Sequence, residues 1–584
     1  MSDGVPKWPT MPSRADPDAV KEAFPFPTYR PEQQSVLEQA AAKLYGDGPT
    51  DTVVIDAPTG VGKSGINTAL CHLARGAFYT TPQKSLRDQL FDDDALRPYL
   101  YPLRARADYQ CPVGEDIEGE PVSCEECPVN TDPGRSCADF GDRCSYWAAK
   151  TDAFDERVVA LTFAFLIADS YLPPFVSAGG GLGGQQTISD YQERQISFDD
   201  RELLVVDEAH LLEEQTASLH VGLTVSPRTL RQGRAEEYLR DARGENDTTP
   251  YEAFQAELPS EESDSLHADA FLPALEAVEG RLNAWCNSLP GGWGRLLSIY
   301  RRRRRAVRRV VQGLSGGADW VVETEERDRP NAPSVTVATF KPVRVAEFLA
   351  NRVWSRADKV VLSTATLPFR ENPARWLRRL GLSPATAEIV SADMPFPPEN
   401  RPVYLGDTVA NMSSGGFSIH FDDVVERLTE LCEFHAGERG LIHTASYSRA
   451  VSVADALGDA ALAHTRQTDA EVALAQWQSS DAQVLCSPSM MDGVDLPDDD
   501  CRWQALLKVP YASLGDPRVE FLVRERNEWD WYHDVAARRV IQSVGRAVRS
   551  PTDHAAYYVL DECFRETVKG RAPGWFIDAI DPPV

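Results

Sequence analysis

The sequence predicts an α/β protein with more than one doubly wound parallel sheet. Its 584 residues and 64.6 kDa exceed what a single hydrophobic core normally supports. Short β-branched runs, such as Thr52 to Ile55 and Leu203 to Val206, are followed by segments that have helical character. Alternating strand and helix signals resume after Pro373, and this alternation is typical of parallel sheets covered by helices.

The composition is that of a folded protein with a strongly acidic surface. The hydrophobic fraction is 42%, the net charge is −29 and the isoelectric point is about 4.8. Only about ten of the 60 basic residues are lysine, and the acidic residues are spread along the chain. We interpret this as adaptation to high salt, with an acidic mesophilic protein as the alternative. A nucleic-acid partner is not excluded, because a small basic groove can exist inside an acidic shell.

The sequence favours a cytoplasmic protein that does not cross a membrane. The first twenty residues lack a charged start followed by an apolar core. The longest apolar run, Val158 to Ala168, is interrupted by Thr162 and is shorter than the roughly 20 residues that span a bilayer.

A phosphate-binding loop is predicted between the first strand and the helix that follows it. The segment DAPTGVGKS supplies a glycine-containing turn, whose backbone amides and helix N-terminus would hold the β- and γ-phosphates. Lys63 would add a positive charge and the Ser64 hydroxyl would bind Mg²⁺. Ala57 stands where the general pattern has its first glycine. The predicted nucleotide-binding residues here are Pro58, Thr59, Gly60, Val61, Gly62, Lys63 and Ser64.

An acidic box follows the run Leu203 to Val206. A carboxylate at the carboxyl end of a buried strand is where an α/β ATPase holds its magnesium. We therefore expect Asp207 to bind Mg²⁺ and Glu208 to polarise the attacking water. His210 would sense the nucleotide and pass its state to the second domain.

Five of the eleven cysteines fall in one short window between the loop and the acidic box. They are Cys111, Cys124, Cys127, Cys137 and Cys144. In a cytoplasmic protein this clustering indicates a metal site rather than disulfides. Spacing alone does not separate zinc from an iron–sulfur cluster.

These motifs, in this order, resemble the XPD/DinG family of superfamily 2 helicases, in which the form APTGxGKS is usual. Thr364 replaces a usual serine, and Asp492 and Asp498 replace a usual glutamate and glycine. The further matching segments are Tyr29 to Gln33, Thr80 to Gln83, Val360 to Leu367, Arg439 to Tyr447, Met491 to Pro497 and Gln542 to Ser550.

The resemblance assigns roles to several of these residues. Gln33 is expected to read the adenine, and Gly493 and Asp495 to complete the ATP site. Gln542 is expected to act in catalysis, and Arg546 and Arg549 to reach the γ-phosphate from the second domain. A [4Fe-4S] cluster is implied on Cys111, Cys124, Cys127 and Cys144, with Cys137 in place of Cys144 as the alternative.

The resemblance also implies a domain plan with two RecA-like motor domains. The first is expected in residues 1–105, 151–213 and 333–372, interrupted by an iron–sulfur insertion at 106–150 and a mostly helical, arch-like insertion at 214–332. The second motor domain is expected at 373–584. Within the arch, the run Arg301 to Arg305 either contacts phosphates or pairs with carboxylates of the protein.

The function implied is an ATP-dependent DNA helicase that moves 5′ to 3′ on single-stranded DNA in repair, replication or recombination. Its cofactors would be ATP, Mg²⁺ and the [4Fe-4S] cluster. Its partners would be single-stranded and forked DNA, with RNA–DNA hybrids as a further substrate, and the protein would be a monomer. The alternative is an ATP-gated remodelling factor that displaces proteins or R-loops with little duplex unwinding.

Overall fold

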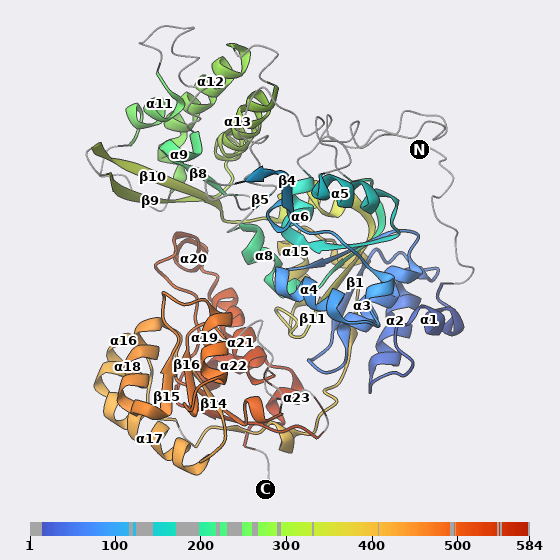
Figure 1. Cartoon of the computed structure of the whole chain (residues 1–584), viewed down its shortest axis with the longest axis vertical. Helices are drawn as coiled ribbons and strands as arrows, with labels where there is room; N and C mark the ends of the chain where they lie inside the picture. Colours follow the sequence, from blue (N-terminus) through green and yellow to red (C-terminus); the bar gives the residue numbers. More distant parts are fainter. Residues whose placement is uncertain are drawn as a thin grey trace.

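Figure 1 shows the computed structural model of the whole chain. The structure describes residues 14–115, 121–123, 144–170, 198–217, 222–230, 248–259, 267–288, 294–329, 332–406, 408–490, 496, 498–545, 548, 550 and 552–581. Within these ranges no helix combines the length and the apolar character that crossing a membrane requires.

The first of the two expected motor domains is built on a seven-stranded parallel sheet with strand order β12-β1-β11-β7-β2-β6-β3. Its strands are β1 (Thr52–Asp56), β2 (Ala77–Thr81), β3 (Tyr101–Pro102), β6 (Val158–Thr162), β7 (Arg201–Val206), β11 (Ala357–Thr364) and β12 (Ala387–Ser391). Its helices are α1 (Pro17–Ala23), α2 (Gln33–Tyr45), α3 (Lys63–Leu73), α4 (Lys84–Asp92), α5 (Ser145–Asp155), α6 (Phe163–Asp169), α8 (Leu212–Gln215), α14 (Ala346–Arg352) and α15 (Pro373–Arg379).

Both faces of this sheet are buried, which explains the continuous apolar runs in its strands. Leu203 and Val205 belong to one apolar core, whereas Leu204 and Val206 belong to a second core. Successive side chains of a strand point to opposite faces, so the two cores lie on the two sides of the sheet. The predicted strands at β1 and β7 are therefore confirmed.

The second motor domain contains a six-stranded parallel sheet with strand order β13-β18-β17-β14-β16-β15. Its strands are β13 (Val403–Tyr404), β14 (Gly440–His443), β15 (Ala461–Ala463), β16 (Val484–Ser487), β17 (Trp503–Leu506) and β18 (Ala556–Val559). Its helices are α16 (Ser414–Ile419), α17 (Phe421–Phe434), α18 (Tyr447–Leu457), α19 (Ala470–Gln478), α20 (Pro517–Glu520), α21 (Trp529–Val544), α22 (Phe564–Val568) and α23 (Gly574–Ile577).

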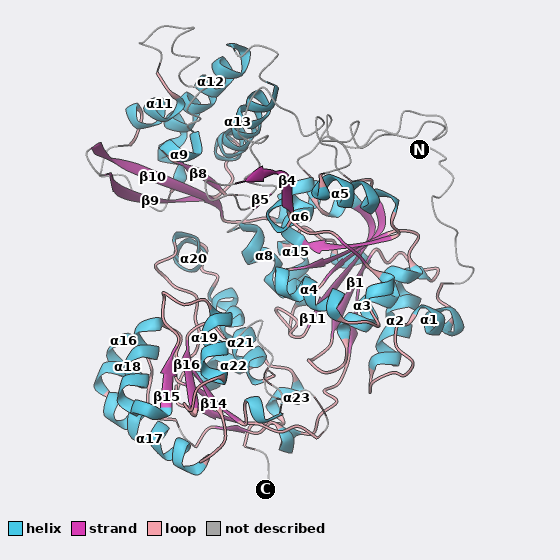
Figure 2. Cartoon of the chain, viewed as in Figure 1, coloured by secondary structure: helices cyan, strands magenta, loops and turns pink. Residues whose placement is uncertain are grey.

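Residues inserted into the first motor domain form two further units. A short hairpin joins β4 (Gln110–Glu115) to β5 (Pro121–Ser123). The larger insertion has its own apolar core, a three-stranded antiparallel sheet of order β8-β10-β9, and helices above that sheet (Figure 2). Its elements are β8 (Leu223–Val225), α9 (Pro227–Leu230), α11 (Pro250–Ala256), α12 (Leu272–Ser288), α13 (Gly294–Ser315), β9 (Trp320–Arg329) and β10 (Ala332–Pro342).

Two domain boundaries in the structure differ from those expected from the sequence. Strand β12 pairs with β1 and is an edge strand of the first sheet, although the expected second domain began at residue 373. The large insertion extends to Pro342 rather than 332, because β10 pairs along its length with β9. Strand β9 carries the charged sequence ETEERDR. This stretch lacks the alternation of apolar and polar residues by which a strand is predicted from the sequence.

Candidate nucleotide-binding and coupling site

The phosphate loop connects β1 to α3 and needs its glycines for conformational reasons. Gly60 has φ 94° and Gly62 has φ 87°, which is left-handed backbone that glycine adopts without strain. A Cβ atom at Gly60 would collide with the ring of Phe396, and one at Gly62 with the amide of Gln33. The loop is thus closely packed on both sides.

The departure at Ala57 does not disturb the loop. Ala57 is fully buried, and its backbone amide donates a hydrogen bond to the Thr364 carbonyl at 3.0 Å. The Lys63 ammonium donates to the Ala57 carbonyl at 3.2 Å. Lys63 therefore lies inside the loop, close to where the phosphates of a nucleotide would be held.

The segment before α2 is fixed against this loop. The Gln33 amide nitrogen donates to the Gly62 carbonyl at 2.9 Å, and its oxygen accepts from the Arg30 backbone amide at 2.9 Å. Beside them lies a cavity of about 550 Å³ that reaches from Gln33 to the two predicted magnesium ligands. The residues lining it are Phe26, Pro27, Thr28, Arg30, Gln33, Gly62, Ser64, Gly65, Leu86, Gln89, Leu90, Asp93, Leu96 and Asp207.

The acidic box directly follows β7, at the carboxyl edge of the sheet. One oxygen of Asp207 accepts a hydrogen bond from the Tyr79 hydroxyl at 3.2 Å, and the other accepts from the Glu208 backbone amide at 3.0 Å. Burial and the nearby charge of Glu208 raise the pKa of Asp207 to about 6, against the opposing effect of Lys63. A bound Mg²⁺ would favour the ionised form.

Glu208 has φ 46°, a left-handed conformation that is uncommon outside glycine. This turn directs the chain from β7 into the short helical segment Ala209–Leu211. The Glu208 carboxylate lies 3.4 Å from Nδ1 of His210. The acidic box is therefore one tight cluster, and its geometry suits a water-polarising carboxylate beside a metal ligand.

His210 connects the first motor domain to the second. Its Nδ1 lies 3.1 Å from the Thr364 hydroxyl, and its Nε2 lies 2.6 Å from the Gln542 side-chain nitrogen. Gln542 also donates to the Thr366 hydroxyl at 3.0 Å. All four side chains are buried. Three segments that are distant in sequence thus meet at this histidine.

The carboxyl end of α21 also reaches the phosphate loop. A Cβ atom at Gly545 would lie 2.8 Å from the Thr59 hydroxyl, so the two backbones are close. Two arginines that are expected to reach the γ-phosphate, Arg546 and Arg549, lie outside the described residues. The predicted ATP-site residues Gly493 and Asp495 also lie outside them. Their roles stay predictions.

Two functional candidates were missed by sequence reasoning. Tyr79 is fully buried on β2, and its hydroxyl contacts both Asp207 and the Asn67 amide. Arg370 forms an ion pair of 2.8 Å with Asp56, the residue that ends β1. Tyr79 lies one residue before the segment Thr80 to Gln83, which offers a weak signal, but nothing in the sequence links Arg370 to Asp56.

The predicted cysteine ligands are only partly described. Cys144 is buried just before α5, and the backbone of Cys111 lies on β4, whereas Cys124, Cys127 and Cys137 lie outside the described residues. Within the described part of the chain no three His, Cys, Asp or Glu side chains form a group suited to a metal ion.

The sequence neighbours of three cysteines nevertheless converge. Gln110 pairs with Ser123 across the hairpin, and the Ser145 hydroxyl donates to the Gln110 carbonyl at 3.1 Å. These three residues are adjacent in sequence to Cys111, Cys124 and Cys144. Residues next to these three cysteines therefore lie near one another, and the cluster itself stays a prediction.

Comparison with known proteins gives matches at three levels. A family model described as the helicase C-terminal domain matches residues 428–579. The 3′-5′ exonuclease DinG of Bacillus subtilis (strain 168) is 23% identical over 311 residues, which are 49% of this chain and 32% of that protein. The human regulator of telomere elongation helicase 1 is 26% identical over 107 residues, 16% of this chain and 9% of that protein. The alignments thus span about a third or less of these curated relatives.

Solved structures match over nearly the whole chain. The structure of S. tokodaii Xpd4 covers 95% of this chain and aligns over its own full length, with a TM-score of 0.53 and 15% identity. A structure of an XPD helicase covers 94% of this chain and 98% of its own, with a TM-score of 0.55 and 14% identity. At these identities the likeness concerns the fold.

Two parallel-sheet domains, with a phosphate loop and an acidic box in the first and a contacting helix from the second, define a helicase-type ATPase with two RecA-like domains. In its ordered motifs, in the match of residues 428–579 to the helicase C-terminal domain and in its fold, the chain is similar to the XPD/DinG family of superfamily 2 helicases.

Proposed function

We propose that this protein is an ATP-dependent DNA helicase that moves 5′ to 3′ on single-stranded DNA and acts in repair, replication or recombination. The observation that carries the proposal is the buried contact between His210 of the acidic box and Gln542 of the second motor domain. Such a contact makes the position of the second domain sensitive to the state of the nucleotide. A motor that alternates between two domain positions can advance along a strand.

In the proposed cycle, ATP and Mg²⁺ occupy the cavity beside the phosphate loop. Lys63 and the loop amides hold the phosphates, Ser64 and Asp207 hold the metal, and Glu208 orients the attacking water. Arg546 and Arg549 supply positive charge to the γ-phosphate from the second domain. Loss of that phosphate weakens the contacts between the domains, and the strand advances.

The cysteine lobe is proposed to hold a [4Fe-4S] cluster on Cys111, Cys124, Cys127 and Cys144. The convergence of Gln110, Ser123 and Ser145 supports a shared site for these thiolates. The cluster would fasten a loop-rich lobe that has little core of its own. It would stand where the strand enters and the duplex parts.

The arginine run on α13 is proposed to line the path of the strand. The side chains of Arg301, Arg302 and Arg305 are exposed. Arg308, one turn further on, lies 3.6 Å from a carboxylate oxygen of Glu279. The helix therefore divides into an exposed basic part, which suits phosphate contacts, and a part that pairs within the insertion.

The proposed substrates are single-stranded and forked DNA, with RNA–DNA hybrids as a further substrate, and the proposed active form is a cytoplasmic monomer. One relative carries the name exonuclease, so shortening of the strand must be separated from its displacement. This is done by measuring the length of the displaced strand as well as its release.

The test is strand displacement from a fork with a 5′ single-stranded tail, with Lys63→Ala as the inactive variant. We expect ATP-dependent release of a full-length strand by the natural protein. The variant should lose turnover at least about 100-fold, as is usual when a group that stabilises developing charge is removed. Lys43→Ala, which removes an exposed surface pair with Glu388, is the control and should retain activity. DNA-stimulated turnover without displacement would favour the remodelling factor.

A further inference from the structure

A segment of the second motor domain joins that domain to the base of the large insertion. This docking segment comprises residues 513–528 and includes α20. Valine and aromatic side chains from both sides form one apolar cluster, and the ring of Phe521 lies 5.3 Å from that of His267 in the insertion. The cluster contains Val321, Val343, Val519, Phe521, Leu522, Val523, Trp531, Tyr532 and Val535.

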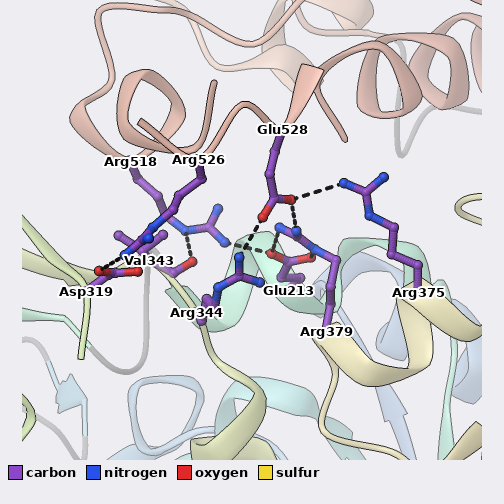
Figure 3. Close-up of polar contacts among 9 residues, drawn as sticks. All are labelled: Glu213, Asp319, Val343, Arg344, Arg375, Arg379, Arg518, Arg526 and Glu528. Atoms are coloured by element: carbon purple, nitrogen blue, oxygen red, sulfur yellow. Dashed lines mark hydrogen bonds and ion pairs between the residues drawn. The ribbon is translucent and has the colours of Figure 1, made fainter. Parts of the chain in front are cut away.

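Charged contacts add to this apolar interface at its edge. The Lys341 ammonium lies 3.3 Å from the carboxylate of Asp516, and Arg526 pairs with Asp319 (Figure 3). Lys341 lies on β10 and Asp319 directly precedes β9. The second motor domain therefore holds both strands at the base of the insertion.

The same segment contacts the helix that follows the acidic box. Arg518 donates to a carboxylate oxygen of Glu213 at 2.8 Å and to the Val343 carbonyl at 3.2 Å. Arg379 of the first domain donates to both carboxylate oxygens of Glu213 and also pairs with Glu528 of the second domain (Figure 3). Glu213 lies only three residues after His210.

These charges are paired although they are buried. The exposed fractions of the whole residues Glu213, Arg379, Arg518 and Glu528 are 9, 8, 4 and 7%. Burial alone would raise the pKa of Glu213, but Arg379 and Arg518 outweigh it and hold the pKa at about 2. Glu213 is thus ionised near neutral pH, and breaking its pairs exposes uncompensated charge.

We propose that Arg518 is a positioning residue that couples the nucleotide state of the acidic box to the large insertion. When the second domain moves relative to the first, Arg518 must release either Glu213 or the base of the insertion. The base is held by the apolar cluster and two further ion pairs, so the contact to Glu213 opens first. The second domain and the base of the insertion then move together.

This inference rests on the proposed function, since it needs a nucleotide-driven movement, but it concerns a different part of the molecule. Its consequence is that the contacts between the insertion and a nucleic-acid strand change with the nucleotide state of the ATP site. The coupling should be measurable without any strand, because nucleotide binding alone biases the two arrangements.

The test is hydrogen–deuterium exchange of the whole protein with and without the non-hydrolysable analogue AMP-PNP and Mg²⁺. Amides of residues 57–64 report nucleotide binding, and amides of residues 320–342 report the base of the insertion. We expect the analogue to slow exchange at both places in the natural protein. At the base the slowing should be at least about five-fold, the lower end of typical coupling between sites.

The deciding variant is the double substitution Glu213→Gln with Arg518→Met, which avoids leaving a buried unpaired charge. It should retain the slowing in the phosphate loop and lose it at the base. Arg539→Met is the matched control. It removes another pair between the two domains, that of Arg539 with Glu214 at 3.1 Å, without touching the insertion, and both signals should persist.

Three results would overturn the inference. The first is an unchanged base in the natural protein while its phosphate loop responds, and the second is a full response at the base in the double variant. In both cases nucleotide binding would be intact and the proposed function would stand. An absent response in the phosphate loop of the natural protein would remove the proposed function and this inference with it.

Discussion

At the scale of single residues, the carboxylate of Asp207 is controlled by a tyrosine on the neighbouring strand. Burial and the charge of Asp207 raise the pKa of Tyr79 well above its ordinary value, so its hydroxyl stays protonated. The hydroxyl donates to Asp207 and accepts from Asn67. Tyr79 thus holds the orientation of a proposed metal ligand.

Tyr79→Phe should therefore weaken Mg²⁺ binding more than it weakens the fold. Loss of a hydrogen bond that orients a metal ligand usually costs about 10- to 100-fold in metal affinity. We expect the Mg²⁺ concentration for half-maximal ATPase to rise at least about ten-fold, while the helical circular dichroism is unchanged. Tyr45→Phe removes a half-buried hydroxyl that donates to the Leu70 carbonyl, away from the site, and should leave the Mg²⁺ curve unchanged. Identical Mg²⁺ curves for Tyr79→Phe and the natural protein would exclude this role.

At the scale of elements, the β4–β5 hairpin and the start of α5 form the lobe that carries the cysteines. Arg106 lies 5.0 Å from the Tyr146 ring, which packs edge-on against Tyr109 and Trp147. Lys150 is buried and pairs with Asp169 at 2.8 Å. These contacts anchor α5 to the first motor domain.

Cys124→Ser should release the proposed cluster without stopping the motor. Iron should fall from about four atoms per chain to nearly none, with loss of the absorption band near ~400 nm and of unwinding. DNA-stimulated ATPase should persist in part, because the phosphate loop and the acidic box are segments separate from the cysteine window. Cys286→Ser, in the apolar core of the large insertion, is the control and should keep its iron. If the natural protein contains zinc instead of iron, the proposed metal is wrong but the proposed cysteine site stands.

At the scale of the whole molecule, the surface carries a large excess of negative charge. The chain has 89 acidic and 60 basic residues. Many basic groups are already engaged between domains, such as Arg379, Arg518 and Arg344. The remaining carboxylates repel one another, and salt screens this repulsion because the Debye length falls from about 10 Å at 0.1 M to about 3 Å at 1 M.

The midpoint of thermal unfolding should therefore rise with KCl. Between 0.1 and 1 M we expect an increase on the order of 5 °C, measured by circular dichroism, as self-repulsion is relieved. Sucrose at equal osmolality is the control for exclusion of solute from the surface and should give a smaller rise. A midpoint that falls as KCl increases would contradict adaptation to high salt.

Much of the nucleotide site could be predicted from the sequence because its chemistry is local. The phosphate loop and the acidic box each follow a buried apolar strand, and the carboxyl ends of parallel strands meet at one edge of a sheet. In the structure Ser64 and Asp207 line one cavity and Lys63 lies inside the phosphate loop, while their roles stay predictions. The order of the motifs was sufficient to indicate two motor domains.

The contacts between distant segments were decided only by the tertiary structure. Arg518 and Glu213 are 305 positions apart, and each has the character of an ordinary surface residue in the sequence. Strand β12 belongs to the first sheet because it pairs with β1, which no local pattern in residues 387–391 reveals. Short-range preferences therefore determined which segments form strands, helices and phosphate-binding turns, whereas long-range packing determined which charges became buried and which domains they join.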